Sequence, residues 1–415
     1  MSALKAGIIL AAMCLMLFSE SRSAVIRVGM SGKFTDVADA VNSASDGDRI
    51  VIEKGIYFVS GLNINKKIIL EGEQDAVLDG SFLKEIITVT SDSVIIKNLT
   101  LRNSGTSYVS DLAAIRLENV KHCALENNVV ENSFFALYLS SSSDCKISGN
   151  RIAGNSVSES FSGNGIHLWK CSGVRISDNT VSGMRDGIYL EFSTNGEISG
   201  NTSFGNLRYG LHFMFSEGNS YTSNTFRNNG AGVAVMYTKK ITMNFNRFED
   251  NWGANSYGLL LKDIDNSLIY GNVFSGNTAG IYAEGTNRVN ILNNTFEKNG
   301  WALKVLGNCY EDTIRYNRFS NNTFDVSTNT SKNANLFLNN FWDKYKGYDL
   351  DNDKKGDVPY RPVSLFSLVV ERVPEAVVLT GSFLVELLDA AEKIIPVFTP
   401  ETLVDNSPLI EERGR

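Results

Sequence analysis

Residues 200–248 read GNTSFGNLRYGLHFMFSEGNSYTSNTFRNNGAGVAVMYTKKITMNFNRF, and one short pattern occurs twice within them. After a Gly, the positions one and three steps on are apolar in both GLHFMF and GVAVMY, whereas the positions between them vary. This alternation with a period of two is typical of a β-strand that buries one face. A further short apolar stretch precedes the Asn of SNTF and of FNRF. The stretch therefore predicts short strands joined by frequent turns.

The same pattern extends along most of the chain, and its Asn recurs at successive spacings of 22, 29, 22, 23, 22, 26, 22, 23 and 23 residues. Three short strands in each unit of 22–23 residues predict an all-β fold, a right-handed parallel β-helix with one coil per repeat. Helical repeats have longer periods. We expect the recurring Asn to be structural, because Asn tolerates left-handed backbone in tight turns and its side chains can bond from coil to coil. The recurring Asn are Asn128, Asn150, Asn179, Asn201, Asn224, Asn246, Asn272, Asn294, Asn317 and Asn340.

The repeat also sets the expected division of the chain. Residues 24–358 are predicted to form the β-helix, with an amphipathic helix in 35–44 capping its first coil. The two longer spacings predict loops near 156–162 and 252–257. Residues 359–415 lack the repeat and are more apolar. They are predicted to form a C-terminal amphipathic helical segment that docks on the last coil or on a partner.

The N-terminus predicts export. Residues 1–23 have the form of a secretory signal peptide, with Lys5, the apolar run GIILAAMCLMLF at 7–18, and the small residues Ser21 and Ser23 before the expected cleavage site. The run is too short to span a bilayer. The formal charge of −7, with no basic block, argues against nucleic acid as a partner. An oxidising compartment permits disulfides, but Cys123 and Cys145, which lie at equivalent repeat positions, are expected to be neighbouring buried thiols rather than a bridge.

Outward-facing positions of successive repeats line up as two columns. The second position after the Gly runs His167, Tyr189, His212, Ala234, and the fourth runs Trp169, Glu191, Met214, Met236. Because stacked coils lie about 5 Å apart, we expect His212, Met214 and Met236 to form one small surface cluster with His167 beside it. Thioether and imidazole ligands together favour Cu(I) among biological metals. The alternative is that a loop, a partner or lipid covers this patch and the methionines make ordinary contacts.

The sequence also bears on two other kinds of site, a polysaccharide-processing active site and a calcium site. Many extracellular β-helices act on polysaccharides and need clustered acid and base groups, but the outward carboxylates here are scattered, and Arg185, Asp186 and Arg208 form no evident acid–base set. An enzyme is therefore not expected. In DLDNDKKGD, Asp349, Asp351 and Asp353 are spaced like the start of a calcium loop, although Lys354 stands where such a loop needs Gly and no Glu follows at position twelve. A solvated acidic turn is the competing interpretation.

Near the C-terminus, EAVVLTGSFLVELLDAAEKIIPVF is strongly apolar and helical in spacing, with an apolar stripe. Interspersed acidic residues rule out a bilayer-spanning helix. The segment is expected to cap the last coil or to bind a membrane partner, since an exposed apolar surface on an exported protein usually has something to bind. The stripe comprises Leu379, Phe383, Leu384, Leu387, Leu388 and Ala391.

The phrases GNGIHLWK, GMRDGIYLEFS, GNLRYGLHFMFS, NNGAGVAVMYT, NWGANSYGLLLKD, AGIYAEGTNR and NGWALKV, with GYDLDNDKKGDVPYRPVSLFSLVVE and VFTPETLVD near the end, closely resemble the NosD family. The resemblance covers nearly all of the chain after the signal peptide. It implies a periplasmic component of an ABC-type transporter complex, associated with the inner membrane through its partners. Those partners would be a membrane permease and, through it, a cytoplasmic ATPase. It also implies a role in maturation of the copper centres of nitrous oxide reductase in denitrification.

The resemblance and the outward cluster meet in one hypothesis. The rod would receive Cu(I) as cargo from a periplasmic copper chaperone, hold it at His212, Met214, Met236 and His167, and present it to the reductase. The C-terminal segment would contact the permease. Two alternatives remain: a scaffold that binds no metal and clamps the reductase during maturation, and a carbohydrate-active β-helix enzyme acting through residues such as Glu191 or Arg208.

Overall fold

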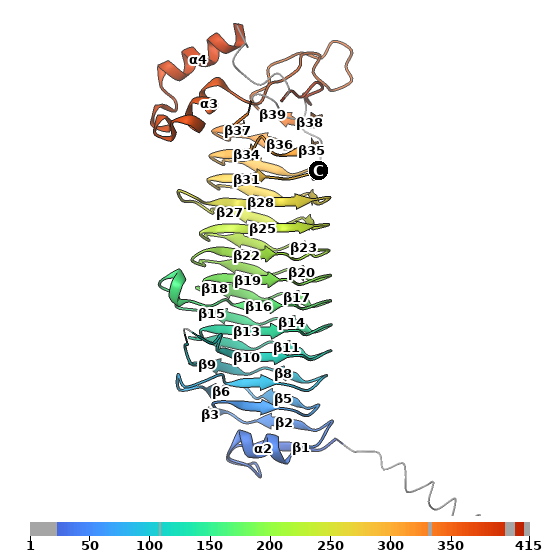
Figure 1. The fold of residues 1–415 in the computed structure, drawn as a ribbon, viewed down its shortest axis with the longest axis vertical. Coiled ribbons are helices and arrows are strands. Elements are labelled where there is room, and N and C mark those ends of the chain that lie inside the picture. Colours follow the sequence, from blue (N-terminus) through green and yellow to red (C-terminus); the bar gives the residue numbers. More distant parts are fainter. Residues whose placement is uncertain (1–22, 108, 331–333, 395–402, 411–415) are drawn as a thin grey trace, which may run out of the picture.

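The computed structural model describes residues 23–107, 109–330, 334–394 and 403–410. The predicted signal peptide, residues 1–23, therefore lies outside the described residues except for Ser23. The chain winds into a long rod of stacked coils, with the N-terminal helix at one end and the C-terminal helices at the other (Figure 1). All pairings between its strands are parallel, and the strands form three sheets that run along the rod.

Each sheet takes one strand from successive coils. The first sheet has 14 strands: β1 Val25–Val28, β2 Arg49–Ile52, β5 Ile69–Gly72, β8 Ile95–Lys97, β11 Ala124–Glu126, β14 Lys146–Ser148, β17 Arg175–Ser177, β20 Glu197–Ser199, β23 Ser220–Thr222, β26 Thr242–Asn244, β29 Leu268–Tyr270, β32 Asn290–Leu292, β35 Tyr310–Arg315 and β38 Ala334–Leu338. The second has 12: β4 Leu62–Ile64, β7 Ile87–Val89, β10 Ala113–Glu118, β13 Phe135–Ser140, β16 Ile166–Trp169, β19 Asp186–Glu191, β22 Tyr209–Met214, β25 Ala231–Lys239, β28 Tyr257–Asp265, β31 Ala279–Glu284, β34 Trp301–Val305 and β37 Phe324–Ser327. The third has 13: β3 Gly55–Phe58, β6 Ala76–Asp79, β9 Thr100–Arg102, β12 Val129–Glu131, β15 Arg151–Ala153, β18 Thr180–Ser182, β21 Thr202–Phe204, β24 Thr225–Arg227, β27 Arg247–Glu249, β30 Val273–Ser275, β33 Thr295–Glu297, β36 Arg318–Ser320 and β39 Phe341–Trp342.

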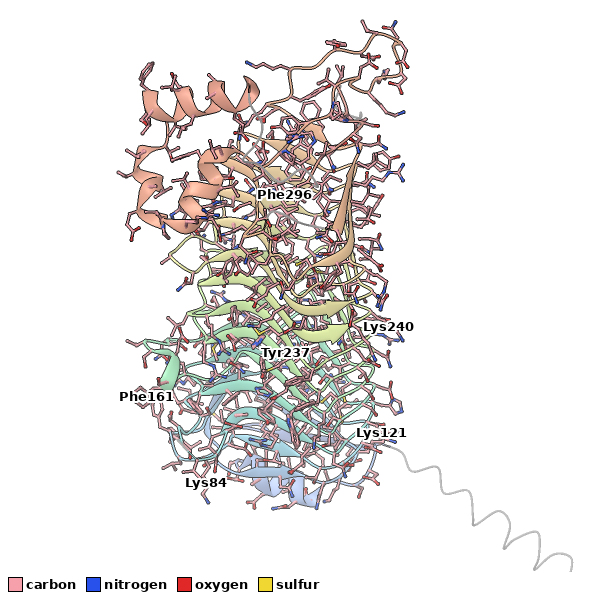
Figure 2. All side chains as sticks on the ribbon, turned by 45° about the horizontal axis from the view of Figure 1, so that its top comes forward. Lys84, Lys121, Phe161, Tyr237, Lys240 and Phe296 are labelled. Atoms are coloured by element: carbon pink, nitrogen blue, oxygen red, sulfur yellow. The ribbon has the colours of Figure 1, made fainter. Side chains whose placement is uncertain are left out.

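This architecture confirms the predicted right-handed parallel β-helix with three short strands in each repeat. The insertion between β15 and β16 carries the short 3₁₀ helix η1 (Glu159–Phe161), and Phe161 marks it on the flank of the rod (Figure 2). The second insertion separates β27 from β28. Both loops were predicted from the longer repeat spacings.

Apolar side chains from the three sheets fill the centre of the rod. One column of aromatic rings runs through the C-terminal half, with adjacent ring centroids 4.1–5.7 Å apart, and Figure 2 labels its member Phe296. Its members are Phe226, Phe248, Phe274, Phe296, Phe319 and Trp342. The four cysteines of the described residues are all buried and unpaired, which agrees with the prediction of buried thiols at Cys123 and Cys145.

The ten recurring Asn form a continuous ladder inside the rod, which we call the Asn ladder. The side-chain amide of each donates to the side-chain oxygen of the next at 2.9–3.1 Å, from Asn128 to Asn340. The predicted bonding between stacked Asn side chains is therefore confirmed. Left-handed backbone was the second reason expected for the recurring Asn, and this prediction is wrong for the ladder Asn themselves. It is the residue before each ladder Asn that has a positive φ, such as Asn127 at 53° and Asn339 at 54°.

Both ends of the rod are covered. At the N-terminal end, α2 (Val37–Ser43) buries Val37, Ala40 and Val41 against the first coil, as predicted, and the side chain of Asp36 caps it by accepting a hydrogen bond from the amide of Asp39. The C-terminal end carries α3 (Leu365–Arg372), the 3₁₀ helix η2 (Pro374–Leu379) and α4 (Phe383–Ile394). These helices confirm the predicted C-terminal helical segment, and Figure 1 shows them projecting to one side of the last coils.

Candidate metal centre

The strand register places the predicted ligand residues in the two expected columns on the outer face of the 12-stranded sheet. In one column His167 pairs with Tyr189, which pairs with His212. In the other, Met214 pairs with Met236 of the next coil. His212 and Met214 lie two residues apart on β22, so both point to the same side of the strand. Three of the four predicted ligands therefore come from two adjacent coils.

The histidines are much more enclosed than expected. Only 5% of His212 and 7% of His167 is exposed, whereas Met214 and Met236 are half-buried. The cluster was expected at the surface, and this prediction is wrong for the two histidines, which are buried. Neighbouring aromatic rings cover them: the Tyr138 ring stacks on His167 at 4.5 Å, and Tyr189 and Tyr209 lie 4.8 and 4.9 Å from His212.

His167 is separated from the other three residues. The ring of Tyr189 lies between the two imidazoles, with its centroid 4.8 Å from each. The side-chain amide of Asn164 contacts Nδ1 of His167 at 3.0 Å. Burial, with a smaller contribution from the Arg185 charge, lowers the pKa of His167 to about 3, so this imidazole is neutral at physiological pH. The structure thus places His167 two coils away from His212.

An ionic group that was not predicted from the sequence adjoins His212. Asp186 is fully buried and accepts from Arg208 through Nε at 2.9 Å, and its Oδ2 lies 3.9 Å from Nδ1 of His212. Burial opposes ionisation of Asp186, but the His212 and Arg208 side chains outweigh it and lower the pKa of Asp186 to about 2. The available signal was spacing: Asp186 and Arg208 are 22 residues apart, which is one repeat, so they lie in adjacent coils.

Several buried polar atoms without hydrogen-bond partners gather around these residues. Of the 13 such side-chain atoms found among the described residues, five lie here: Oδ1 of Asn164, Nε2 of His167, Nε of Arg185, and both ring nitrogens of His212. Buried polar groups in folded proteins nearly always have a partner, so each exception needs an explanation such as a bound ion or water. The free nitrogens of His212 fit a role in binding an ion.

The two methionines border a column of exposed aromatic residues. Met214 accepts a weak hydrogen bond from the hydroxyl of Tyr189, whose Oη lies 3.7 Å from Sδ. The residues that follow Glu191, Met214 and Met236 are Phe192, Phe215 and Tyr237, whose rings stack at 5.2 and 5.3 Å and are 46%, 44% and 41% exposed. Tyr237 is labelled in Figure 2. We call these three residues the aromatic turn column.

The predicted calcium residues also come together. The carboxylate oxygens of Asp349, Asp351 and Asp353 lie within 4.8 Å of one another. Backbone amides already donate to this group, among them that of Asp353 to Asp349 at 3.2 Å, and the ammonium of Lys355 lies 2.7 Å from Asp353. These donors occupy part of the hydrogen-bonding capacity of the carboxylates, and calcium binding stays a prediction.

The fold and the site together define a parallel β-helix protein with a candidate metal site, in which thioether and imidazole side chains lie beside a buried ionic group. Comparison with known proteins identifies the family. A family model described as "Periplasmic copper-binding protein (NosD)" matches residues 154–350. A protein of Pseudomonas aeruginosa named "Probable ABC transporter binding protein NosD" is 30% identical over 407 residues, which cover 93% of this chain and 94% of the relative. The chain belongs to the NosD family.

Two further comparisons agree with this assignment and with the fold. A protein of the same name from Stutzerimonas stutzeri is 28% identical over 376 residues, covering 84% of each chain. The A-module of a mannuronan C-5 epimerase from Azotobacter vinelandii superposes with a TM-score of 0.53 at 14% identity over 74% of this chain and 88% of that one, a likeness of fold alone. Among the described residues no helix combines the length and apolarity needed to cross a bilayer.

Proposed function

We propose that this protein is the periplasmic component of an ABC-type transporter complex and that it accepts Cu(I) and delivers it for assembly of the copper centres of nitrous oxide reductase. The observation that carries the proposal is the in-register pair of Met214 and Met236 beside His212. Soft thioethers with an imidazole favour Cu(I) over the commoner divalent ions. The description of the family as periplasmic and copper-binding supports both the cargo and the compartment.

The difference in burial between the sulfurs and the imidazole suggests how the cargo would bind. Met214 and Met236 are half-buried and reach solvent, whereas His212 is covered by the Tyr189 and Tyr209 rings and is only 5% exposed. An arriving ion therefore meets the thioethers first and the imidazole second. Neutral thioethers bind weakly compared with thiolates, and the four thiols of the described residues are buried in the core. Such ligation suits a site that passes an ion on.

Binding, rather than catalysis, is also the role that the ionic group supports. Asp186 is fully enclosed and held by Arg208, so its carboxylate has no access to a polymeric substrate. The relatives are named as binding proteins. We therefore propose that this protein shares the fold of the mannuronan epimerase but not its enzymatic activity.

The C-terminal helices offer a surface for the membrane permease. Helix α3 packs on β37 through Phe366 and Phe324, whose ring centroids are 5.8 Å apart, and α4 turns Val385 inward. The opposite side of α4 exposes Phe383, Leu384 and Leu387, at 78%, 51% and 55%. These residues belong to the predicted apolar stripe, and they remain uncovered after the helices have packed on the rod.

A Cu(I) titration against a competing chelator tests the copper site. The His212→Ala, Met214→Ala, Met236→Ala triple variant should lose most of the affinity of the signal-free protein. Glu284→Ala is a matched control, because Glu284 occupies the same outward column two coils beyond Met236. Equal binding by wild type and triple variant, or binding by neither, would refute the copper site.

The permease contact needs a different test. Phe383→Ser, Leu384→Ser and Leu387→Ser together should abolish co-purification with the permease, whereas Met30→Ser with Val109→Ser, two exposed apolar residues elsewhere, should not. Truncation would be misleading, because residues 403–410 return to the last coil, where Leu403 and Asp405 are fully buried. Unchanged co-purification of the triple-Ser variant would contradict this contact.

One observation favours the scaffold alternative, in which the protein clamps the reductase and binds no metal. The aromatic turn column exposes apolar ring edges directly beside Met214 and Met236. A partner that packed on these rings would cover the methionines as well, and they would then be ordinary apolar contacts. The Cu(I) titration decides between the two functions, because the scaffold predicts no specific binding by the wild-type protein.

A further inference from the structure

Asp186 is a fully buried carboxylate at the start of β19, in a column of the fold that holds aromatic or apolar residues in the coils that follow. The register pairs it with Tyr209 and then Ala231 of the next two coils, and the equivalent position further along holds Tyr257, Ala279, Trp301 and Phe324. Burying a carboxylate costs several kcal/mol before its partners compensate. Since apolar and aromatic residues occupy this position in the coils that follow, the buried charge at Asp186 points to a local function.

The contacts of Asp186 fix its two oxygens in different ways. Oδ1 accepts from Nε of Arg208 at 2.9 Å and from the backbone amide of Tyr209 at 3.3 Å. Oδ2 accepts from Nη2 of Arg208, and Nε of Arg185 and Nδ1 of His212 lie 3.7 and 3.9 Å from it. A bidentate Arg–carboxylate pair is the most rigid arrangement available to this group. The carboxylate is thus a fixed acceptor beside the imidazole of His212.

His212 lacks the hydrogen-bond acceptor that Asp186 can offer. Neither of its ring nitrogens has a hydrogen-bond partner, although the residue is almost fully enclosed. In a neutral imidazole one nitrogen carries the proton and the other has the lone pair that binds a metal. Metal-binding histidines usually donate the proton of the other nitrogen to a carboxylate or carbonyl, which fixes the tautomer and the ring orientation. Asp186 is the carboxylate that faces Nδ1.

We propose that Asp186, clamped by Arg208, is the positioning residue for His212. Its carboxylate holds the imidazole as the Nδ1–H tautomer and leaves the lone pair of Nε2 for the cargo ion. Turning the ring so that Nδ1 approaches Oδ2 by about 1 Å completes an ordinary hydrogen bond. This inference rests on the proposed function, in which His212 is a ligand, and it adds the residue that sets the tautomer and orientation of that ligand.

The tautomer can be measured without copper. The chain has three histidines, so nitrogen NMR of protein labelled in its histidine rings gives few signals to assign. In the metal-free wild type, Nδ1 of His212 should be protonated and Nε2 should not, and Asp186→Asn should mix or reverse the two tautomers. Arg208→Lys keeps the carboxylate and a positive charge but loses the bidentate clamp, so it should give an intermediate result. An unchanged His212 tautomer in Asp186→Asn would overturn the proposal.

Cu(I) affinity supplies the second measurement. Asp186→Asn should weaken binding 10–100-fold, the usual effect of removing a carboxylate behind a metal-binding histidine. In a His212→Ala background the same substitution should weaken it no further, because Asp186 acts through His212. A further loss of the same size in that background would mean that Asp186 only maintains the fold, and would refute the proposal. If the wild-type protein does not bind Cu(I), the proposed function is refuted instead. The NMR measurement of the His212 tautomer then tests by itself whether Asp186 positions the ring.

Discussion

The carboxylate of Asp405 accepts a hydrogen bond from the side-chain amide of Asn340 at 3.0 Å, so a residue 65 positions further along the chain ends the Asn ladder. The same oxygen accepts from the backbone amide of Asn340 at 2.9 Å and from Nε1 of Trp342 at 3.2 Å. The other oxygen accepts from the backbone amide of Asn339. The last coil is therefore closed by residues that return from beyond the C-terminal helices.

Asp405→Ala should destabilise the protein substantially. The substitution leaves the Asn340 amide and the Trp342 indole without acceptors inside the rod, and each buried unsatisfied donor costs about 1–3 kcal/mol. We expect the free energy of unfolding to fall by roughly 2–4 kcal/mol, measured by denaturant titration. Asp405→Asn is the matched control, because its side-chain oxygen reproduces the acceptor of the other ladder residues. A loss below about 0.5 kcal/mol in Asp405→Ala would show that the closure contributes little.

The contrast between the Asn ladder and its closure shows what the sequence makes predictable. Ten Asn at a 22–23-residue period indicate coil length, stacking and strand count, because each coil repeats the contacts of the last. Asp405 belongs to no repeat, and nothing in its local sequence relates it to Asn340. The left-handed turns were predicted at the ladder Asn because Asn suits both a left-handed turn and a buried ladder. Only the backbone angles show that the preceding residue makes the turn and the Asn makes the ladder.

A second prediction concerns pH. Burial is the main cause that raises the pKa of Asp312 to about 6, while Thr286 and the amide of Val289, which donates at 2.8 Å, oppose the rise. A carboxyl whose pKa is higher in the folded state stabilises the fold below its unfolded pKa of about 4, and that contribution is lost as pH rises through about 6. Asp312→Asn should therefore raise the free energy of unfolding at pH 7 by on the order of 1–2 kcal/mol.

The measurement is the free energy of unfolding of both proteins at pH 4, 5, 6 and 7, where the expected gain of the variant shrinks toward acid pH. Asn also suits the position, because the amide of Asp312 already donates to Asn335 at 2.8 Å, in the manner of the Asn ladder. A variant that is less stable than wild type at pH 7 would contradict the argument. An equal difference at all four pH values would exclude ionisation of Asp312 as its cause.

The aromatic turn column gives a third prediction. Phe192, Phe215 and Tyr237 all have left-handed backbone, with φ of 50°, 51° and 55°, a region that bulky residues avoid at a cost of about 1–2 kcal/mol each. Stacking between neighbouring rings stabilises the fold by about 0.5–1.5 kcal/mol per pair. Because the two effects nearly cancel, Phe215→Asn should change the free energy of unfolding by less than about 1 kcal/mol. Phe226→Ala, in the buried aromatic column, should cost about 3–5 kcal/mol.

Thermal and denaturant unfolding of these two variants checks the comparison. A loss in Phe215→Asn as large as that in Phe226→Ala would mean that the aromatic turn column is a structural requirement of the solenoid. The expected small change would leave its three exposed rings without a structural purpose, and would strengthen the case that a partner packs on them beside Met214 and Met236.

The candidate metal centre was predictable in part. Register follows from the repeat, so the columns that contain His212, Met214 and Met236 could be aligned from sequence spacing. The burial of the two histidines could not be predicted, because Tyr138, Tyr189 and Tyr209 cover them through ring orientations that sequence spacing does not determine. The same rings separate His167 from His212. The Asp186–Arg208 pair carried a visible signal, a separation of one repeat. However, Asp186 is the first residue of β19 and Arg208 directly precedes β22, so neither belongs to the two columns that the sequence pattern aligned.

X-ray absorption spectroscopy of the Cu(I)-loaded protein is the decisive experiment for the copper site, because it reports the atoms bound to the ion. We expect sulfur together with imidazole nitrogen among the atoms bound to the ion. The sulfur should be lost in Met214→Leu with Met236→Leu, and the imidazole signal should be lost in His212→Ala. A first shell of oxygen and nitrogen alone, or a sulfur shell that survives the double Leu substitution, would contradict it.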